Sequence, residues 1–178
     1  MTKLLALWFC LAPILMAAAQ AFPPSPAGTP EFKTLPAGML LKSAAAGDYF
    51  AQSGRLFRPL FAYISKHDIA MTTPVEARMD GAAMFFWVAA SERAKVAGSG
   101  EGVEVIEVPE RHVASLGARG GYTESNFRRT RDELLVWLRT KPDVQPAGEP
   151  YAVFWNGPFL PGFLKHYEVH VPVRPAGA

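Results

Sequence analysis

One order of structural elements occurs twice along the chain, and this internal repeat limits the fold more than any other feature of the sequence. In the first half, the apolar and turn-forming residues predict two paired strands, a helix and two further strands, at residues 32–35, 39–43, 49–64, 70–79 and 83–90. After a linker at 91–102 the same order is predicted again, at residues 103–108, 111–117, 123–138, 151–155 and 168–173. The pattern therefore predicts an α+β protein of two repeated halves, with about eight strands and two helices.

Both predicted helices begin next to a residue that can accept a hydrogen bond from the first helical turn. Asp48 precedes the first helix and Thr123 the second, and both residue types are common N-caps. The second helix is expected to end before Pro142.

The first 21 residues have the organisation of a secretory signal peptide. Lys3 supplies a positive charge, an apolar stretch follows over 4–16, and residues 19–21 read A-Q-A, an A-x-A cleavage site. A membrane-spanning helix needs about 20 apolar residues, so the shorter stretch favours a cleaved signal over the alternative, an uncleaved anchor. We therefore expect an exported protein, periplasmic or secreted, that is not an integral membrane protein after cleavage. The proline-rich residues 22–31 are predicted to be a flexible lead-in to a single domain at 32–175.

Composition argues against several classes of function. The formal net charge is +2 at pH 7, whereas nucleic-acid binding requires a basic patch or stripe. Cys10, the single cysteine, lies within the signal peptide, so the exported domain has no disulfide, thiolate ligand or cysteine nucleophile. Motifs such as H-E-x-x-H and G-x-S-x-G do not occur in the sequence. We therefore expect a non-catalytic protein that does not bind nucleic acid.

Three stretches of the sequence together resemble the SOUL heme-binding protein family. Residues 57–64 read F-R-P-L-F-A-Y-I, similar to the family's F-x-x-L-x-x-Y-I helix, and residues 69–75 read I-A-M-T-T-P-V, similar to its I-x-M-T-x-P-V strand. Residues 158–161 read P-F-L-P and lead to Glu168-Val169, similar to the family's proline-containing loop and closing E-V strand. The resemblance implies a distorted antiparallel β-barrel with the two helices packed outside it. It also implies a hydrophobic groove that holds heme or another tetrapyrrole without a covalent bond.

The resemblance further indicates which side chains would meet such a ligand. In the family, basic side chains bind the propionates, a role that is open here to Arg55, Arg58 and Lys66. Aromatic side chains would supply the apolar contacts, and the candidates are Phe57, Phe61, Trp87 and Trp155. A solvated helix face for the basic residues and a core position for the tryptophans are the alternatives.

The sequence leaves the metal ligand unknown. Heme iron is commonly held by histidine, methionine, cysteinate or tyrosinate. Some family members carry a histidine on the strand before the first helix, but residues 39–43 read M-L-L-K-S here. His67, after the first helix, and Met71, in the following predicted strand, remain candidates. An exposed histidine and a core-filling methionine are the corresponding alternatives.

Glu168 and His170 share one face of the last predicted strand, opposite Val169 and Val171. If the valines pack in the core, Glu168 and His170 face either water or a ligand, and both are candidate binding residues. The resemblance extends to bacterial effector-binding domains, in which a glutamate of the last strand faces a ligand pocket. The second hypothesis is therefore a module that binds a cationic small molecule or a partner instead of heme, with Glu168 as its polar anchor.

Overall fold

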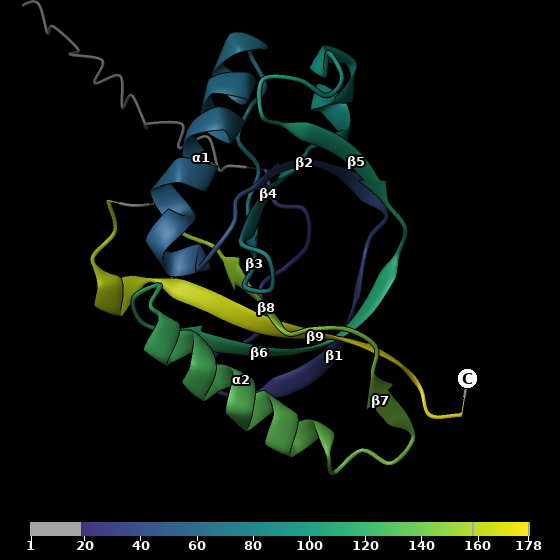
Figure 1. Cartoon of the computed structure of the whole chain (residues 1–178). Coiled ribbons are helices and arrows are strands. Elements are labelled where there is room, and N and C mark those ends of the chain that lie inside the picture. Colours follow the sequence, from purple (N-terminus) through teal and green to yellow (C-terminus); the bar gives the residue numbers. More distant parts are fainter. Residues whose placement is uncertain (1–18, 158, 178) are drawn as a thin grey trace, which may run out of the picture.

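The computed structural model describes residues 19–157 and 159–177, which form one sheet of nine antiparallel strands and two main helices (Figure 1). The strands are β1 (Pro30–Leu35), β2 (Gly38–Ala44), β3 (Val75–Arg78), β4 (Ala83–Val88), β5 (Glu104–Val108), β6 (Arg111–Arg119), β7 (Val144–Pro146), β8 (Tyr151–Phe154) and β9 (His166–Pro175). The helices are α1 (Tyr49–Lys66) and α2 (Glu124–Leu138), with short 3-10 helices η1 (Ala90–Lys95) and η2 (Gly162–Leu164). Within the described ranges, no helix has both the length and the apolar character needed to cross a membrane. The predicted α+β class is confirmed, and β7 is the strand that the sequence pattern missed.

The sheet is a curled half-barrel rather than a closed barrel. Its strands follow the order β1-β6-β9-β8-β3-β4-β2-β5, and β7 pairs with β9 outside this path. Figure 1 shows the sheet curling around its inner side, with β1 and β5 at the two ends of the path. Because these two edge strands do not pair with each other in the described structure, the expectation of a barrel is corrected to an open sheet.

Neither of the two predicted hairpins at the start of the halves forms. β1 pairs with β6, with Phe32 opposite Ala114, and β2 pairs with β4 and β5. The first strand of each half therefore lies beside a strand of the other half. Turn residues such as Pro36-Ala37-Gly38 reverse the chain direction but do not choose a pairing partner, which explains the error. The two strands that close each half do pair with each other, β3 with β4 and β8 with β9.

The two helices begin where their caps predict. Asp48 Oδ1 accepts a hydrogen bond from the Ala51 amide at 2.9 Å, and Thr123 Oγ1 accepts one from the Asn126 amide at 3.2 Å. α1 continues through Pro59, which has no amide hydrogen to donate within the helix. The packing of α1 against the sheet therefore outweighs the loss of that hydrogen bond.

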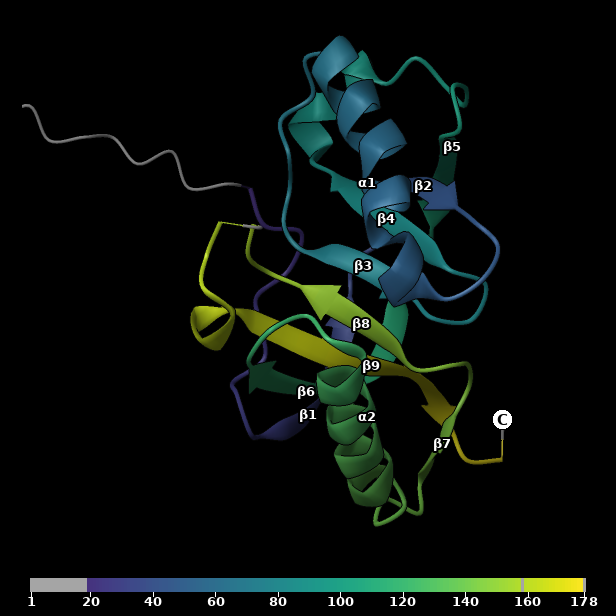
Figure 2. The same cartoon turned by 60° about the vertical axis from the view of Figure 1, so that its left-hand side comes forward.

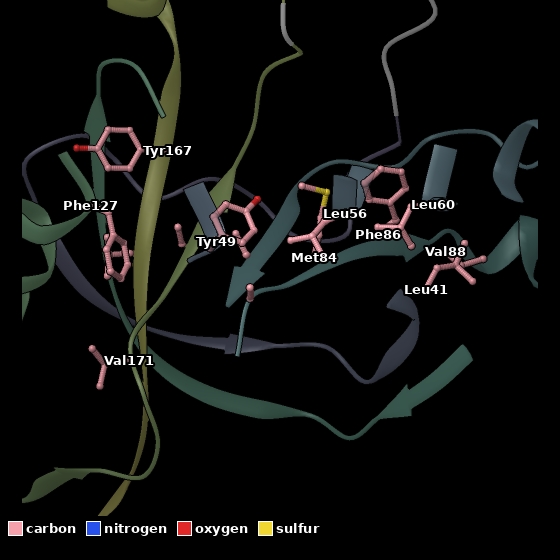
Figure 3. Packing of buried hydrophobic residues seen from close by; sticks show 14 of the residues in the cluster. Leu41, Tyr49, Leu56, Leu60, Met84, Phe86, Val88, Phe127, Tyr167 and Val171 are labelled. Carbon is pink, nitrogen blue, oxygen red and sulfur yellow. The ribbon is translucent and has the colours of Figure 1, made fainter. Parts of the chain in front are cut away.

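Both helices cover the same face of the sheet, which we call the outer face (Figure 2). Phe86 of β4 packs there with Leu60 of α1, and Val171 of β9 belongs to the same buried cluster as Leu134 of α2. Figure 3 shows part of this cluster, with Phe86 close to residues of α1. Trp87, the next residue on β4, points the other way and joins a second buried cluster on the opposite, inner face.

Candidate functional site

Polar side chains are concentrated on the inner face, where they alternate along the strands with residues of the outer core. Glu168 and His170 of β9 are both 0% exposed, and Glu76 of β3 is 1% exposed. The strand register runs from Glu76 through Val153 of β8 to Glu168, so the two residues share a face and their backbones lie about 10 Å apart. Glu168 and His170 thus share a face as their alternation predicts, and that face is buried rather than open to water.

Glu168 accepts hydrogen bonds from five residues, one of which is Lys33, whose Nζ lies 3.4 Å from Oε2. Its Oε1 accepts from the Ser25 backbone amide and from Trp155 Nε1, each at 2.7 Å. Its Oε2 accepts from Ser115 Oγ at 3.0 Å and from His170 Nε2 at 2.7 Å. Both carboxylate oxygens are therefore already occupied by donors of this chain.

The surroundings of Glu168 keep its carboxylate ionised. Burial by itself raises the pKa of this carboxyl, because the charged form loses its hydration. His166, with Nε2 3.7 Å from Oε1, and the hydrogen-bonded His170 act in the opposite direction, as does the charge of Lys33. Lys33 Nζ lies 3.4 Å from Oε2, and its side chain is only 10% exposed. The pKa of Glu168 consequently lies below its ordinary value of 4.5.

Glu76 is the centre of a second, similar arrangement. Its Oε1 accepts a hydrogen bond from Trp87 Nε1 at 3.0 Å and another from Arg111 Nη2 at 2.8 Å. Glu76 and Glu168 are thus each paired with a tryptophan and a cationic side chain, and Glu168 has two histidines beside it as well. The pairing of Glu76 with Arg111 and of Glu168 with Lys33 balances the charges on this face.

Residues 19–28, which we call the N-terminal strap, lie across the inner face. Phe22 is 5% exposed, and its ring centroid lies 5.7 Å from that of Trp87 and 5.5 Å from that of Trp155, with the rings nearly perpendicular. Ser25 is also buried, with its amide bonded to Glu168. Composition predicts a flexible lead-in here, and the structure instead shows a docked segment. The difference arises because its partners are supplied by strands that are distant in the sequence.

The outer surface of α1 carries a pair of stacked aromatic rings. The ring centroids of Phe57 and Phe61 are 5.5 Å apart with an angle of 17° between the planes, and Phe61 is 49% exposed. Arg55 and Arg58 are exposed on the same helix, and neither forms a hydrogen bond or ion pair within the described part of the chain. These four predicted residues therefore offer apolar area and unpaired positive charge to a ligand from solution.

The predicted iron ligands near α1 do not join this ring pair. His67 is the C-cap of α1, and its ring centroid lies 4.6 Å from that of Tyr63, a residue on the buried side of the helix. Met71 is 37% exposed in the segment before β3, which begins at Val75 rather than at residue 70.

The remaining histidine candidate is already engaged. Both ring nitrogens of His170 have partners, since Nε2 bonds to Glu168 and Nδ1 lies 3.3 Å from the Tyr151 hydroxyl. No group of three histidine, cysteine, aspartate or glutamate side chains that could hold a metal ion occurs among residues 19–157 and 159–177.

The structure therefore divides the predicted binding residues between two places. The residues of α1 lie on the outer side, together with His67, the C-cap of the helix. Glu168 and His170 lie on the inner face with both tryptophans that were predicted to line the same site.

The comparisons with known proteins bear on this division. Residues 27–172 match the sequence model of the SOUL heme-binding protein family. The chain belongs to that family. The match covers both α1 and the polar residues of the inner face, so family membership does not indicate which of the two is the ligand-binding site. No curated protein matches this SOUL family member.

Several solved structures share the fold at low sequence identity. A cryo-EM structure of an EcmrR–DNA complex has a TM-score of 0.63 and 13% identity, covering 82% of this chain and 57% of that one. The crystal structure of the EcmrR C-terminal domain has a TM-score of 0.62 and 14% identity, covering 82% and 97%. An uncharacterized conserved protein from Listeria innocua has a TM-score of 0.63 and 12% identity, covering 84% and 94%. The chain thus spans little more than half of the EcmrR chain in the complex, and these likenesses show the fold alone.

Sequence reasoning missed most partners of Glu168. His166 is absent from the predicted binding residues, but it is the first residue of β9 and lies on the same face as Glu168. Extending the alternation of β9 by two residues would have found it. Lys33, Phe22 and Ser25 carry no comparable signal, because their contacts with Glu168 and the tryptophans depend on the tertiary fold.

Proposed function

We propose that the protein binds a tetrapyrrole, heme or an iron-free porphyrin, on the outer surface of α1. The observation that carries this proposal is the stacking of Phe61, which is 49% exposed, on Phe57, which is partly buried against Phe86, together with the unpaired arginines of the same helix. A stable helix surface exposes large aromatic rings at a cost, because apolar area in contact with water is unfavourable. A flat macrocycle that covers these rings would remove that cost.

The positions along α1 support a site for a flat ligand. Phe50, Gly54, Phe57 and Phe61 recur at spacings of four, three and four residues, so they form one stripe along the helix. A Cβ atom at Gly54 would meet nothing within 4 Å, so the stripe has open space between its aromatic rings. Arg58 follows Gly54 by one helical turn and can pair with a propionate at the border of the stripe.

The donor set fits a porphyrin ring better than it fits an iron centre. None of the histidines or methionines in the described residues is shown to share the stripe, and His67 contacts Tyr63 on the buried side of α1. The chain would therefore hold the macrocycle by ring packing and by Arg58, with no axial ligand from His67. Heme bound in this way would supply its own redox chemistry, and the protein would supply binding alone.

A pair of titrations tests this proposal. The protein is titrated with hemin and, separately, with iron-free protoporphyrin IX, and the Soret band is followed. We expect saturable one-to-one binding of both ligands, because ring packing does not require the metal. Phe61→Ala should weaken both by about tenfold or more, since it removes most of a phenyl ring from the contact. Arg58→Gln should weaken the binding of both ligands. A porphyrin whose propionates are esterified should bind Arg58→Gln and wild type with equal affinity.

The control is Phe32→Ala, which removes a ring of similar exposure, 46%, from β1. It should leave both titrations unchanged. If Phe61→Ala and Phe32→Ala behave alike, or if the response never saturates, the α1 stripe is not the binding site.

Binding of an organic cation at Glu168, the other function that the sequence leaves open, has less support. Lys33 already stands 3.4 Å from the carboxylate, so a cation would add charge to a balanced site. We infer that the activity is binding rather than catalysis, on the support of the family description and the absence of catalytic motifs in the sequence. We also infer export, on the sequence of residues 1–21 alone, and N-terminal sequencing of the protein recovered from its native compartment would test it.

A further inference from the structure

The N-terminal strap docks on the inner face in the way that a peptide ligand docks on a receptor. It is held at one end by the Ala21 amide, which donates to Thr73 O at 2.8 Å, and at the other by the Gly28 amide, which donates to Gly117 O at 2.8 Å. Between these ends, Phe22 fills the space between two tryptophans. We propose that the inner face is a peptide-binding site, and that residues 22–28, the part of the strap that follows the predicted cleavage site, are its resident ligand.

Gly117 gives the clearest sign that the site is shaped around a bound backbone. A Cβ atom at this position would lie 2.5 Å from the Ser25 carbonyl oxygen and 2.7 Å from that of Pro26. Both are backbone atoms, so no side-chain rotation can relieve the contact. β6 therefore carries a residue without a side chain at the place where the strap crosses it.

The contacts of the strap define the chemistry of a ligand that could replace it. An aromatic ring must fit between Trp87 and Trp155, at centroid distances of 5.7 and 5.5 Å. A backbone amide must donate to Glu168 Oε1, as the Ser25 amide does at 2.7 Å. A carbonyl oxygen must accept from Lys33 Nζ, as Pro23 O does at 2.6 Å.

These three requirements describe an extended peptide in which an aromatic residue is followed by Pro-Pro-Ser or a similar sequence. The prolines favour such a ligand, because they restrict the free peptide to extended conformations and lower the entropy lost on binding. A cationic ligand does not meet these requirements, because the positive charges of Lys33 and Arg111 already balance the negative charges of the two carboxylates.

The polar residues of this face also indicate a binding surface rather than an ordinary core. Glu76, Glu168 and His170 are fully buried, and apolar side chains of similar size would fill a core with equal or greater stability. In the structure, Glu168 is covered by a segment without helix or regular strand, which is held by Phe22, by the Pro23 and Ser25 hydrogen bonds and by the Gly28 amide. Local opening of such a segment requires less free energy than unfolding of the sheet.

The test uses the chain from Phe22 onward, the form expected after cleavage of residues 1–21, and a fluorescent peptide with the sequence of residues 22–28. In wild type the tethered strap competes with the added peptide at a high effective concentration, so binding should be weak. Phe22→Ala weakens the resident strap and leaves the site intact, so the apparent Kd for the peptide should fall by about tenfold or more. Ser25→Pro removes the amide donor to Glu168 while keeping Phe22, and it should act in the same direction if Phe22→Ala impairs folding.

Two controls locate the binding. A peptide with alanine in place of its phenylalanine should not bind Phe22→Ala protein. Adding Gly117→Ala to the Phe22→Ala protein should abolish peptide binding, whereas adding Gly157→Ala should not, because a Cβ atom at Gly157 meets nothing within 4 Å.

The result that would overturn the proposal is a folded Phe22→Ala or Ser25→Pro protein that binds the peptide no better than wild type does. Peptide binding that persists with Gly117→Ala would also overturn it, because the peptide would then be bound elsewhere. The porphyrin titrations report on α1 and are independent of these outcomes.

Discussion

Replacing Glu168 by glutamine removes a charge from the inner face without creating a cavity, because the two side chains have nearly the same size. The carboxylate accepts hydrogen bonds from Ser25, Trp155 and His170 at 2.7 Å and from Ser115 at 3.0 Å. A glutamine presents only one oxygen, so its amide group must face two of these donors. We expect the substitution to destabilise the folded protein through electrostatics and hydrogen bonding alone.

The size of the effect follows from the buried charge that is left behind. Breaking a buried ion pair by removing one partner costs about 3–5 kcal/mol, because the other charge stays in a poorly solvated place. Lys33 keeps 10% exposure of its side chain and has Glu31 Oε1 at 3.9 Å, which compensates part of the loss. We therefore expect Glu168→Gln to lower the free energy of unfolding by about 3 kcal/mol, at the lower end of that range.

Urea denaturation of wild type and variant measures this difference. The matched control is Glu104→Gln, which breaks an ion pair with Lys42 at 2.8 Å whose side chains are 56% and 32% exposed. Exposed pairs of this kind contribute about 0–1 kcal/mol. The double variant Lys33→Met, Glu168→Gln should lose less stability than the sum of the two single variants. If Glu168→Gln costs no more than Glu104→Gln, the inner-face network does not stabilise the fold and the reasoning is refuted.

The same carboxylate makes a prediction about acid. The pKa of Glu168 is lower in the folded protein than its ordinary value of 4.5, so protonation favours the unfolded state. Its contribution to stability is fully present above the unfolded pKa and is lost as the pH falls below that value toward the folded pKa. Wild type should therefore lose more stability on acidification below pH 4.5 than Glu168→Gln does. Equal acid dependence of the two proteins would show that another group controls it.

Three further predictions follow from other parts of the molecule. His67→Ala should leave the porphyrin titrations unchanged, because its ring packs against Tyr63 and away from the α1 stripe; a lost Soret shift would contradict this. Asp48→Ala removes the N-cap bond to the Ala51 amide and should cost about 1 kcal/mol, measured by thermal unfolding against Asp80→Ala as control. Burial raises the pKa of Tyr122 to about 12. The contribution of Tyr122 to the free energy of unfolding is therefore fully present below the ordinary pKa of 10, and it is lost as the pH rises toward 12. In a titration followed by tyrosinate absorbance, Tyr122→Phe should show one fewer tyrosine than wild type that ionises above pH 10.

The sequence predicted those parts of the fold that depend on neighbouring residues. Asp48 and Thr123 cap the two helices as expected, because an N-cap bond joins residues three apart. The alternation of Glu168 and His170 with the valines placed both on one face for the same reason. Local pattern was sufficient in each case.

The errors concern partners that are distant in the sequence. The turn at Pro36-Ala37-Gly38 looked like a hairpin, yet β1 pairs with β6, about 80 residues further along the chain. Proline-rich residues 22–25 looked flexible because they cannot form regular structure by themselves, although Phe22 and Ser25 find partners on strands that form much later in the sequence. The separation of α1 from Glu168 could not be seen either, since it depends on which face of the sheet each strand position meets.

The position of β1 and β5 has a consequence for how the molecule holds together. Each half completes the sheet of the other, since β1 lies beside β6 and β5 beside β2. The two halves thus exchange edge strands, as the subunits of a domain-swapped dimer do, and the linker at residues 91–102 joins them covalently. A chain cut within that link would yield two fragments that three strand pairs join to each other, β1 with β6, β2 with β5 and β3 with β8. Such fragments should fold only by associating with each other, and the intact chain should unfold in a single cooperative step despite its two recognisable halves.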